Sequence, residues 1–388
     1  MGAFPRGVPK IRDGDARSTN RHLDDHRLGG RFASVVNYIV PYAGGSTTAP
    51  PQGPDGRRFG VTHPRRTKTR RPRNLLPGTY RRLATQAGVH QADTFDPAVK
   101  QFQRAVRPSE PIFDDPALGA RWRAARRTAM EHILAIVAES PWSPHLVLRG
   151  SILLKAWLGD EAREPGDIDW VVTPLTMMLD DRRTADMLEG LVAAVRERPI
   201  AGANVTIAED VAAENIWTYE RAPGRRLVFT WSTTDAPDGT VQCDFVFNER
   251  LPLPAAPTTV LRLDGGDSVT VLAAGPALSL AWKILWLDTD FYPQGKDLYD
   301  AALLAERTYL PLDLLREVLS KELGPDAELF SADQVLGWQV DWDNFRLEYP
   351  WVRGSAADWQ ARLYQAIQGT FGASPGDTQD PPSGTIAS

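Results

Sequence analysis

The chain has 388 residues, 42% of them hydrophobic and 24% charged, which is the balance of an ordinary soluble globular protein with room for two compact units. Its single cysteine excludes an internal disulfide, and its six histidines show no Cys/His spacing of a zinc site. The longest apolar run is about half of the ~20 residues that a membrane helix needs, and the arginine-rich start lacks the apolar core of a signal peptide. A cytoplasmic protein without a membrane role is therefore expected.

The charge is divided unevenly along the chain. Residues 1–82 hold 17 Lys/Arg against 5 Asp/Glu, whereas the rest of the chain holds 27 against 44. The start is also rich in Gly, Pro, Ser and Thr, and such a composition buries too little apolar surface to offset the entropy of ordering it. The sequence predicts a basic, largely disordered arm over residues 1–95, which is either a plain solvated tail or a polyanion-binding segment.

The pattern after the arm predicts a mixed α/β half followed by a helical half. Apolar residues at helical spacing indicate a helix over 118–138, and Leu146–Leu148 is a short apolar strand. Polar, Pro/Gly-rich residues return at 371–388. The elements expected between are a helix at 152–158, a strand at 167–172, a helix at 178–196, strands at 203–207, 227–231, 241–247 and 260–263, and helices from 276 to about 367.

Two aspartates occupy one strand of this pattern. Asp167 and Asp169 are two residues apart, so both carboxylates project from the same face of the strand. Neighbouring carboxylates repel each other, and Asp is depleted from strands. A single aspartate is more simply explained by a helix cap or an arginine partner. The pair instead favours a divalent cation, which offsets the repulsion and keeps both side chains ionised.

Asp244 is a third candidate ligand. In the strand at 241–247 the apolar residues Val241, Cys243, Phe245 and Phe247 share one face, so Asp244 lies on the other. Oxygen ligands in this number suit Mg²⁺ or Mn²⁺ rather than zinc.

Gly150-Ser151 stands where the strand ending near Leu148 turns into the next helix. Backbone N–H groups and a hydroxyl at such a turn can bind phosphate oxygens, and glycine permits close approach of the backbone. A plain helix N-cap formed by Ser151 is an equally good explanation of this dipeptide alone.

Lys283 lies in an almost wholly apolar stretch, residues 277–287. A lone ammonium on a buried helix is costly unless it meets an anion, and a triphosphate in the cleft is a candidate. The alternative is a lysine whose stem is buried and whose head reaches the solvent.

The Gly-Ser turn, the Asp-x-Asp strand and the later aspartate resemble the nucleotidyltransferase superfamily whose fold is like that of polymerase beta. Leu146–Ser151, Asp167–Asp169, Lys283 and Lys296–Asp300 are similar to the AbiEii/AbiGii toxins of bacterial toxin–antitoxin and phage-defence systems. The resemblance covers roughly residues 118–305. Glu164-Pro165-Gly166 replaces the Arg/Ser-containing turn more common in that family, and the basic N-terminus is not a family feature.

The resemblance implies an α+β fold in which a polymerase-beta-like domain, a mixed sheet flanked by helices at residues 115–265, precedes an all-helical domain at 270–370. It implies transfer of a nucleoside monophosphate from an NTP to an acceptor, expected to be RNA and in particular the tRNA 3′ end, and a cognate antitoxin. The site would consist of two Mg²⁺ ions on Asp167, Asp169 and Asp244, phosphate contacts from Gly150 and Ser151, a charge-neutralising Lys283, and Asp297 as the family's last functional aspartate. Asp244 would also be available to deprotonate the acceptor hydroxyl.

Two other functions fit the same residues. A small-molecule nucleotidyltransferase acting on an aminoglycoside would suit the acidic body, which attracts a polycation. A catalytically silent nucleotide-binding module would keep the fold without turnover.

Overall fold

The computed structural model describes residues 75–83, 86–202, 204–219, 221–260 and 268–372. The expected arm up to residue 74, the end of the strand expected at 260–263 and the tail from residue 373 lie outside the described residues. The described structure starts at residue 75, ahead of the start near residue 95 that composition suggested. None of the helices in these ranges is both long and apolar enough to cross a bilayer.

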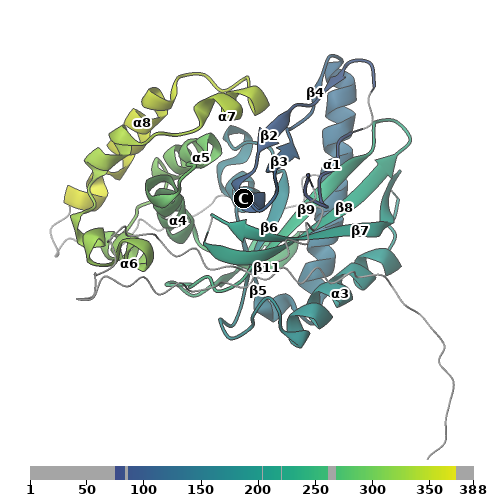
Figure 1. Ribbon diagram of the computed structural model, residues 1–388, viewed down its shortest axis with the longest axis horizontal. Helices are drawn as coiled ribbons and strands as arrows, with labels where there is room; N and C mark the ends of the chain where they lie inside the picture. Colours follow the sequence, from purple (N-terminus) through teal and green to yellow (C-terminus); the bar gives the residue numbers. More distant parts are fainter. Residues whose placement is uncertain (1–74, 84–85, 203, 220, 261–267, 373–388) are drawn as a thin grey trace, which may run out of the picture. The chain divides into compact units, whose positions relative to one another are not determined.

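A seven-stranded mixed sheet organises the described residues, in the strand order β10-β11-β5-β6-β9-β8-β7 (Figure 1). Its inner strands β5 and β6 are antiparallel, whereas β6 and β9 are parallel. The sheet, with helices beside it, confirms the α+β class. The strands are β5 (Leu146–Arg149), β6 (Asp167–Val172), β7 (Val205–Thr218), β8 (Ala222–Thr233), β9 (Gly239–Val246), β10 (Ala256–Val260) and β11 (Val269–Ala273).

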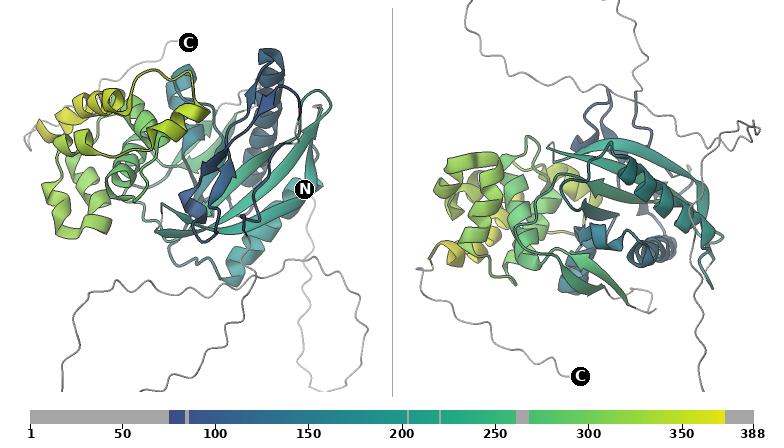
Figure 2. Two further views of the ribbon diagram at one scale, coloured as in Figure 1. Left: turned by 45° about the horizontal axis from the view of Figure 1, so that its top comes forward. Right: turned by 90° about the horizontal axis from the view of Figure 1, so that it is seen from below.

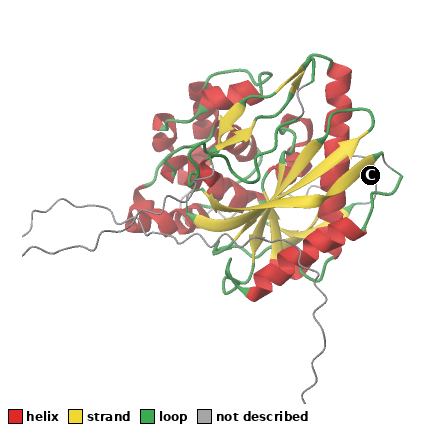
Figure 3. Cartoon of the chain, turned by 45° about the vertical axis from the view of Figure 1, so that its right-hand side comes forward, coloured by secondary structure: helices red, strands yellow, loops and turns green. Residues whose placement is uncertain are grey.

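One face of the sheet is covered by the helices α1 (Pro116–Glu139) and α3 (Arg182–Glu197), which Figure 3 shows beside the strands. The carboxylate of Asp115 accepts a hydrogen bond from the backbone of Ala117 and caps α1. The alternation expected along β6 and β9 is confirmed, because their apolar positions enter this core. These positions are Ile168, Trp170 and Val172 of β6, and Val241, Cys243 and Phe245 of β9.

A second core lies on the opposite face and contains the helical half. Val147 of β5 and Val171 of β6 enter it from the sheet. Helix α4 is buried on nearly all sides, which explains its unbroken apolar sequence. The helices are α2 (Ser151–Leu158), α4 (Pro276–Thr289), α5 (Gly295–Ala305), α6 (Leu312–Leu323), α7 (Trp342–Glu348) and α8 (Ala356–Gly372).

Residues 86–113, which we call the N-terminal segment, form short strands that the sequence pattern did not indicate. They are β1 (Val89–His90), β2 (Asp93–Phe95), β3 (Val106–Pro108) and β4 (Ile112–Phe113). Arg107 of β3 forms a two-pronged ion pair with Glu348 of α7, at 2.7 and 2.8 Å. Figure 2 shows this segment, in dark blue, between the sheet and the helical half.

Candidate active site

A row of four charged side chains crosses the inner strands at one level. Arg149 of β5 is the register partner of Asp169 of β6, Asp169 is the partner of Asp244 of β9, and Asp244 is the partner of Arg226 of β8. Neighbouring strands lie about 4.8 Å apart, so the two aspartates are direct neighbours with an arginine on either side. The row is therefore cation, anion, anion, cation.

Asp167 and Asp169 both face the helical half, and both are half-buried. The hydroxyl of Ser151 donates a hydrogen bond to Asp167 at 3.1 Å. Among the described residues, no side chain or backbone N–H is placed to donate a hydrogen bond to Asp169. The two neighbouring carboxylates thus retain free oxygen lone pairs.

Gly150 has a positive φ of 84°, and a Cβ on it would lie 2.5 Å from a carboxylate oxygen of Asp169. Only glycine permits this packing without strain. Gly150 is also the N-cap residue of α2, and Ser151 is the first residue within the helix. The N-cap explanation of Ser151 is therefore wrong, since its hydroxyl is directed to Asp167.

Gly150→Ala is expected to lower the free energy of unfolding by about 2 kcal/mol or more, because it adds a clash to an unfavourable φ. Gly159→Ala at the other end of α2 is the matched control, with φ 59° and open space around a built Cβ. Denaturant unfolding of both variants measures the difference. Equal losses would show that Asp169 does not pack against Gly150.

Burial, together with the charges of Asp167 and Asp244, raises the pKa of Asp169 to about 8. The pKa of Asp167 is lowered instead, because Lys296, Arg163 and the Ser151 hydroxyl together outweigh the effect of burial. Asp167 is thus readily ionised, whereas Asp169 keeps its proton near neutral pH when no cation is bound.

This pKa predicts a pH dependence of stability. Between the unfolded pKa near 4 and the folded pKa, the unfolded state has lost the Asp169 proton while the folded state keeps it, so this group makes stability fall as pH rises. Relative to Asp169→Asn, the wild-type protein without metal should lose at least about 1.4 kcal/mol between pH 5 and pH 8. Denaturant unfolding across this range measures the difference, and parallel curves would contradict the raised pKa.

Asp244 is held by an arginine. Nε and Nη2 of Arg226 donate to its two oxygens, each at 2.9 Å, and Nη1 of Arg226 donates to Asp96 of the N-terminal segment at 2.6 Å. Within the described ranges, no group of three His, Cys, Asp or Glu side chains is placed to hold a metal ion. The three expected acids nevertheless line one cavity, and Asp169 and Asp244 are register partners, while the guanidinium of Arg226 engages both oxygens of Asp244. The role of Asp244 as a base for the acceptor hydroxyl stays a prediction.

Lys283 also has partners that the sequence did not reveal. Its side chain is 5% exposed, and Nζ donates to Asp297 at 2.9 Å and to Asp300 at 3.0 Å. Asp300 in turn accepts hydrogen bonds from Arg163. Burial alone would lower the pKa of Lys283, but the two carboxylates raise it. The ammonium thus meets an anion, as expected, but the anions are the protein's own carboxylates, and the solvent-reaching alternative is wrong.

Two further cations lie at the site without appearing among the expected residues. Lys296, at the start of α5, is partly exposed and its charge acts on both Asp167 and Asp169. Arg149 is 2% exposed, and its buried Nη1 has no hydrogen-bond partner within the described structure. Lys296 stands next to Asp297 in the sequence and could have been inferred from that position. Arg149 could have been inferred from its place before Gly150.

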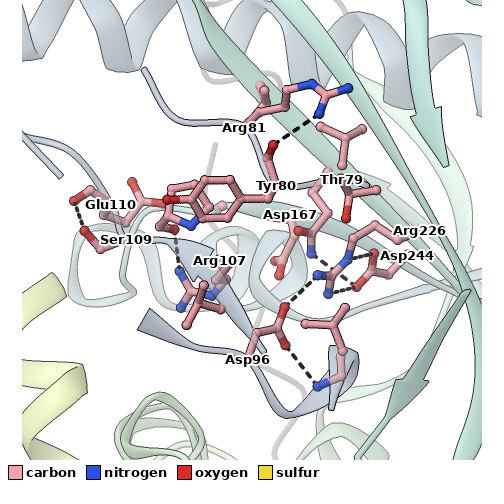
Figure 4. A pocket seen from close by; sticks show the side chains of 18 of the residues that line it. Thr79, Tyr80, Arg81, Asp96, Arg107, Ser109, Glu110, Asp167, Arg226 and Asp244 are labelled. Carbon is pink, nitrogen blue, oxygen red and sulfur yellow. Dashed lines mark hydrogen bonds and ion pairs between the residues drawn. The ribbon is translucent and has the colours of Figure 1, made fainter. Parts of the chain in front are cut away.

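The acidic pair borders a cavity of about 180 Å³ and a smaller one of about 20 Å³. The smaller cavity is lined by Gly150, Ser151 and Lys283, with Arg149 and Lys296 shared between the two. Figure 4 shows residues of the larger one, with Arg226 between Asp96 and Asp244. The charged side chains lining the larger cavity are Arg81, Arg107, Arg126, Arg149, Arg163, Arg226 and Lys296, and Asp96, Glu110, Asp167, Asp169 and Asp244.

Comparison with known proteins finds matches to a protein family and to solved structures. The family described as nucleotidyl transferase AbiEii toxin, type IV TA system, matches residues 132–362. Among solved structures, MenT4, a nucleotidyltransferase toxin from Mycobacterium tuberculosis H37Rv, is similar with a TM-score of 0.46 and 14% identity, over 65% of this chain and 85% of that chain. No curated protein matches the sequence significantly.

Proposed function

The chain belongs to the AbiEii family of nucleotidyl transferase toxins of type IV toxin–antitoxin systems and is a nucleotidyltransferase, and from this premise we propose that it joins a nucleoside monophosphate to RNA at Asp167 and Asp169. The observation that carries the proposal is the pair of neighbouring, half-buried carboxylates beside the Gly150–Ser151 turn. Among the described residues no Lys or Arg side chain donates a hydrogen bond to this pair, which therefore has the donor chemistry that Mg²⁺ or Mn²⁺ requires.

The residues fit one divalent ion. Asp167 retains lone pairs beyond the one that accepts from Ser151, and the raised pKa of Asp169 reflects repulsion that a cation would remove. Asp167 and Asp169 would hold this ion. When bound, it supplies positive charge to the phosphate under attack and orients the NTP.

Residues of the smaller cavity suit the triphosphate. The backbone of Gly150 can approach phosphate oxygens closely, and the start of α2 presents N–H groups there. Arg149 and Lys296 supply the positive charge, since Arg149 keeps an unpaired N–H and Lys296 is partly exposed. Lys283 and Asp297 line the same space, and we propose that Lys283 adds charge for the leaving pyrophosphate while Asp297 holds its ammonium in place.

The lining of the larger cavity favours a polyanionic acceptor. It contains seven Lys/Arg and five Asp/Glu, although residues 83–388 as a whole are strongly acidic. Arg107 and Arg163 are paired with Glu348 and Asp300 outside the lining, so the attraction for RNA and the repulsion of a polycationic aminoglycoside rest on Arg81 and Lys296. The basic residues before position 83 add positive charge of the kind that RNA binding uses.

Membership of this family also indicates the partners of the reaction. A type IV toxin–antitoxin system implies a cognate antitoxin and an NTP substrate. We propose that the acceptor is the 3′ end of tRNA in the cytoplasm, that its modification stops translation, and that phage defence is the resulting role.

Incubation with α-labelled NTPs and Mg²⁺, together with either total RNA or an aminoglycoside panel, tests the proposal. Label is expected in the tRNA fraction and nowhere in the panel. Label on an aminoglycoside would show that the acceptor is a small molecule rather than RNA. Nucleotide binding without transfer to any acceptor would contradict the proposed reaction.

A further inference from the structure

Arg226 occupies the position at Asp244 where a second metal ion would be expected in a three-carboxylate site. Its fork engages both oxygens of Asp244 at 2.9 Å, and Gln242 donates a further hydrogen bond to that carboxylate at 3.2 Å. The side chains of Arg226 and Asp244 are 6% and 9% exposed. A buried, two-pronged arginine–carboxylate pair is among the stronger polar contacts in proteins.

The guanidinium is also fixed from its far side. Asp96 accepts from Nη1 of Arg226 at 2.6 Å, and the other oxygen of Asp96 accepts from the backbone of Ala98. Arg226 therefore spans the two carboxylates and is held by both. Asp96 precedes residue 132, so the anchor lies outside the region that the family matches.

Arg149, the arginine at the other end of the row of four charged side chains, has different partners. Arg149 is the register partner of Asp169, yet its guanidinium lies 3.8 Å from Glu249 and over the rings of Tyr219 and Trp282. Within the described structure it donates no hydrogen bond to Asp169. Of the three acids, only Asp244 forms an ion pair with a guanidinium from the part of the chain that the structure describes.

We propose that Arg226 serves as the permanent second cation of this site, so that the protein binds one divalent ion, on Asp167 and Asp169, and Asp244 is not a ligand. The arrangement supplies a fixed positive charge beside the ion without a second metal. It rests on the divalent-ion chemistry of the proposed function, but it concerns how many ions bind rather than which acceptor reacts.

Titration of the full-length protein with Mn²⁺ alone, followed by the electron paramagnetic resonance signal of the free ion, tests this count. One Mn²⁺ per chain is expected for the wild type. Asp169→Asn should weaken binding at least tenfold, because a direct ligand is lost. The decisive variant is the double exchange Asp244→Asn with Arg226→Gln, which removes one charge of each sign and leaves the net charge of the site unchanged.

If Asp244 is not a ligand, the double variant binds one Mn²⁺ with an affinity within about threefold of wild type. A tenfold or greater loss of Mn²⁺ affinity, which is expected when a metal ligand or a residue that orients a ligand is removed, would overturn the inference. So would none or two Mn²⁺ per wild-type chain, an outcome that does not depend on the folding of the double variant. A protein that binds one Mn²⁺ in this way but transfers no nucleotide would leave this inference standing and remove the proposed function.

Discussion

Asp169→Ala is expected to reduce nucleotide transfer by at least about 10³-fold while the protein keeps its fold. Asp169 is one of the two carboxylates proposed to hold the divalent ion, whose contribution to the transition state is several kcal/mol. The side chain has no hydrogen-bond donor among the described residues, and its pKa is raised by burial and by its acidic neighbours. Its removal therefore relieves the cost of burying a carboxyl group beside other acids, so the melting temperature should stay the same or rise.

Asp186→Ala provides the matched control for this experiment. Asp186 is an acid on the exposed side of α3, paired only with Arg182 one turn away. Its removal should leave transfer unchanged and stability within about 0.5 kcal/mol. Wild-type transfer by Asp169→Ala would show that the reaction does not take place at this carboxylate pair.

Lys283→Met is expected to destabilise the protein by about 3–5 kcal/mol, the range for breaking a buried ion pair. The substitution leaves Asp297 without its cation, while Asp300 retains Arg163. Transfer should fall by ~10²-fold or more in the molecules that remain folded, because a positive charge beside the proposed triphosphate site is lost. Denaturant unfolding and transfer rates at a temperature well below the transition measure the two effects.

A compensated variant separates the structural effect from the chemical one. Lys283→Met combined with Asp297→Asn removes both charges of the pair and should recover much of the lost stability without recovering transfer. Lys321→Met is the control for loss of a partly exposed lysine, whose one ion pair is to Glu249 at 3.3 Å. Recovery of transfer together with stability would mean that Lys283 and Asp297 only hold α4 and α5 together.

The features set by local pattern were predicted from the sequence. The apolar run at Leu146 corresponds to β5, and the strand predicted around Asp169 corresponds to β6. Asp244 lies on the face of its strand opposite Cys243, as predicted. The Gly150 turn was also located correctly, because a strand followed directly by a helix requires a tight connection there. Each of these depends on residues that are close in the sequence.

The features that the sequence did not reveal depend on distant partners. Arg226 and Asp96 are separated by 130 residues, and Lys283 and Asp297 lie on different helices. A charged residue in an apolar stretch signals that a partner exists without identifying it. For Lys283 the partner is the protein's own carboxylate, where the sequence suggested a ligand.

Dependence on distant partners also explains which strands the sequence did not predict and which element boundaries it predicted wrongly. β11 pairs with β5, more than a hundred residues earlier, and extends the sheet to Ala273, past the boundary expected near residue 265. β7 continues to Thr218, past the end expected at residue 207, because residues 211–218 also pair with β8. Helix α3 starts at Arg182 rather than Met178, because Asp181 accepts a hydrogen bond from the backbone of Met178 and forms a turn there.

The central claim is that this site transfers a nucleotidyl group, and the fate of two labels tests it most directly. Parallel reactions with α-labelled and γ-labelled NTP, the same RNA and Mg²⁺ would be separated into RNA and small products. The account predicts that the α label appears in RNA and that the γ label is released entirely as pyrophosphate, both in wild-type protein and neither with Asp169→Ala. Transfer of the γ label to RNA, or release of the γ label as inorganic phosphate without α label in RNA, would contradict it.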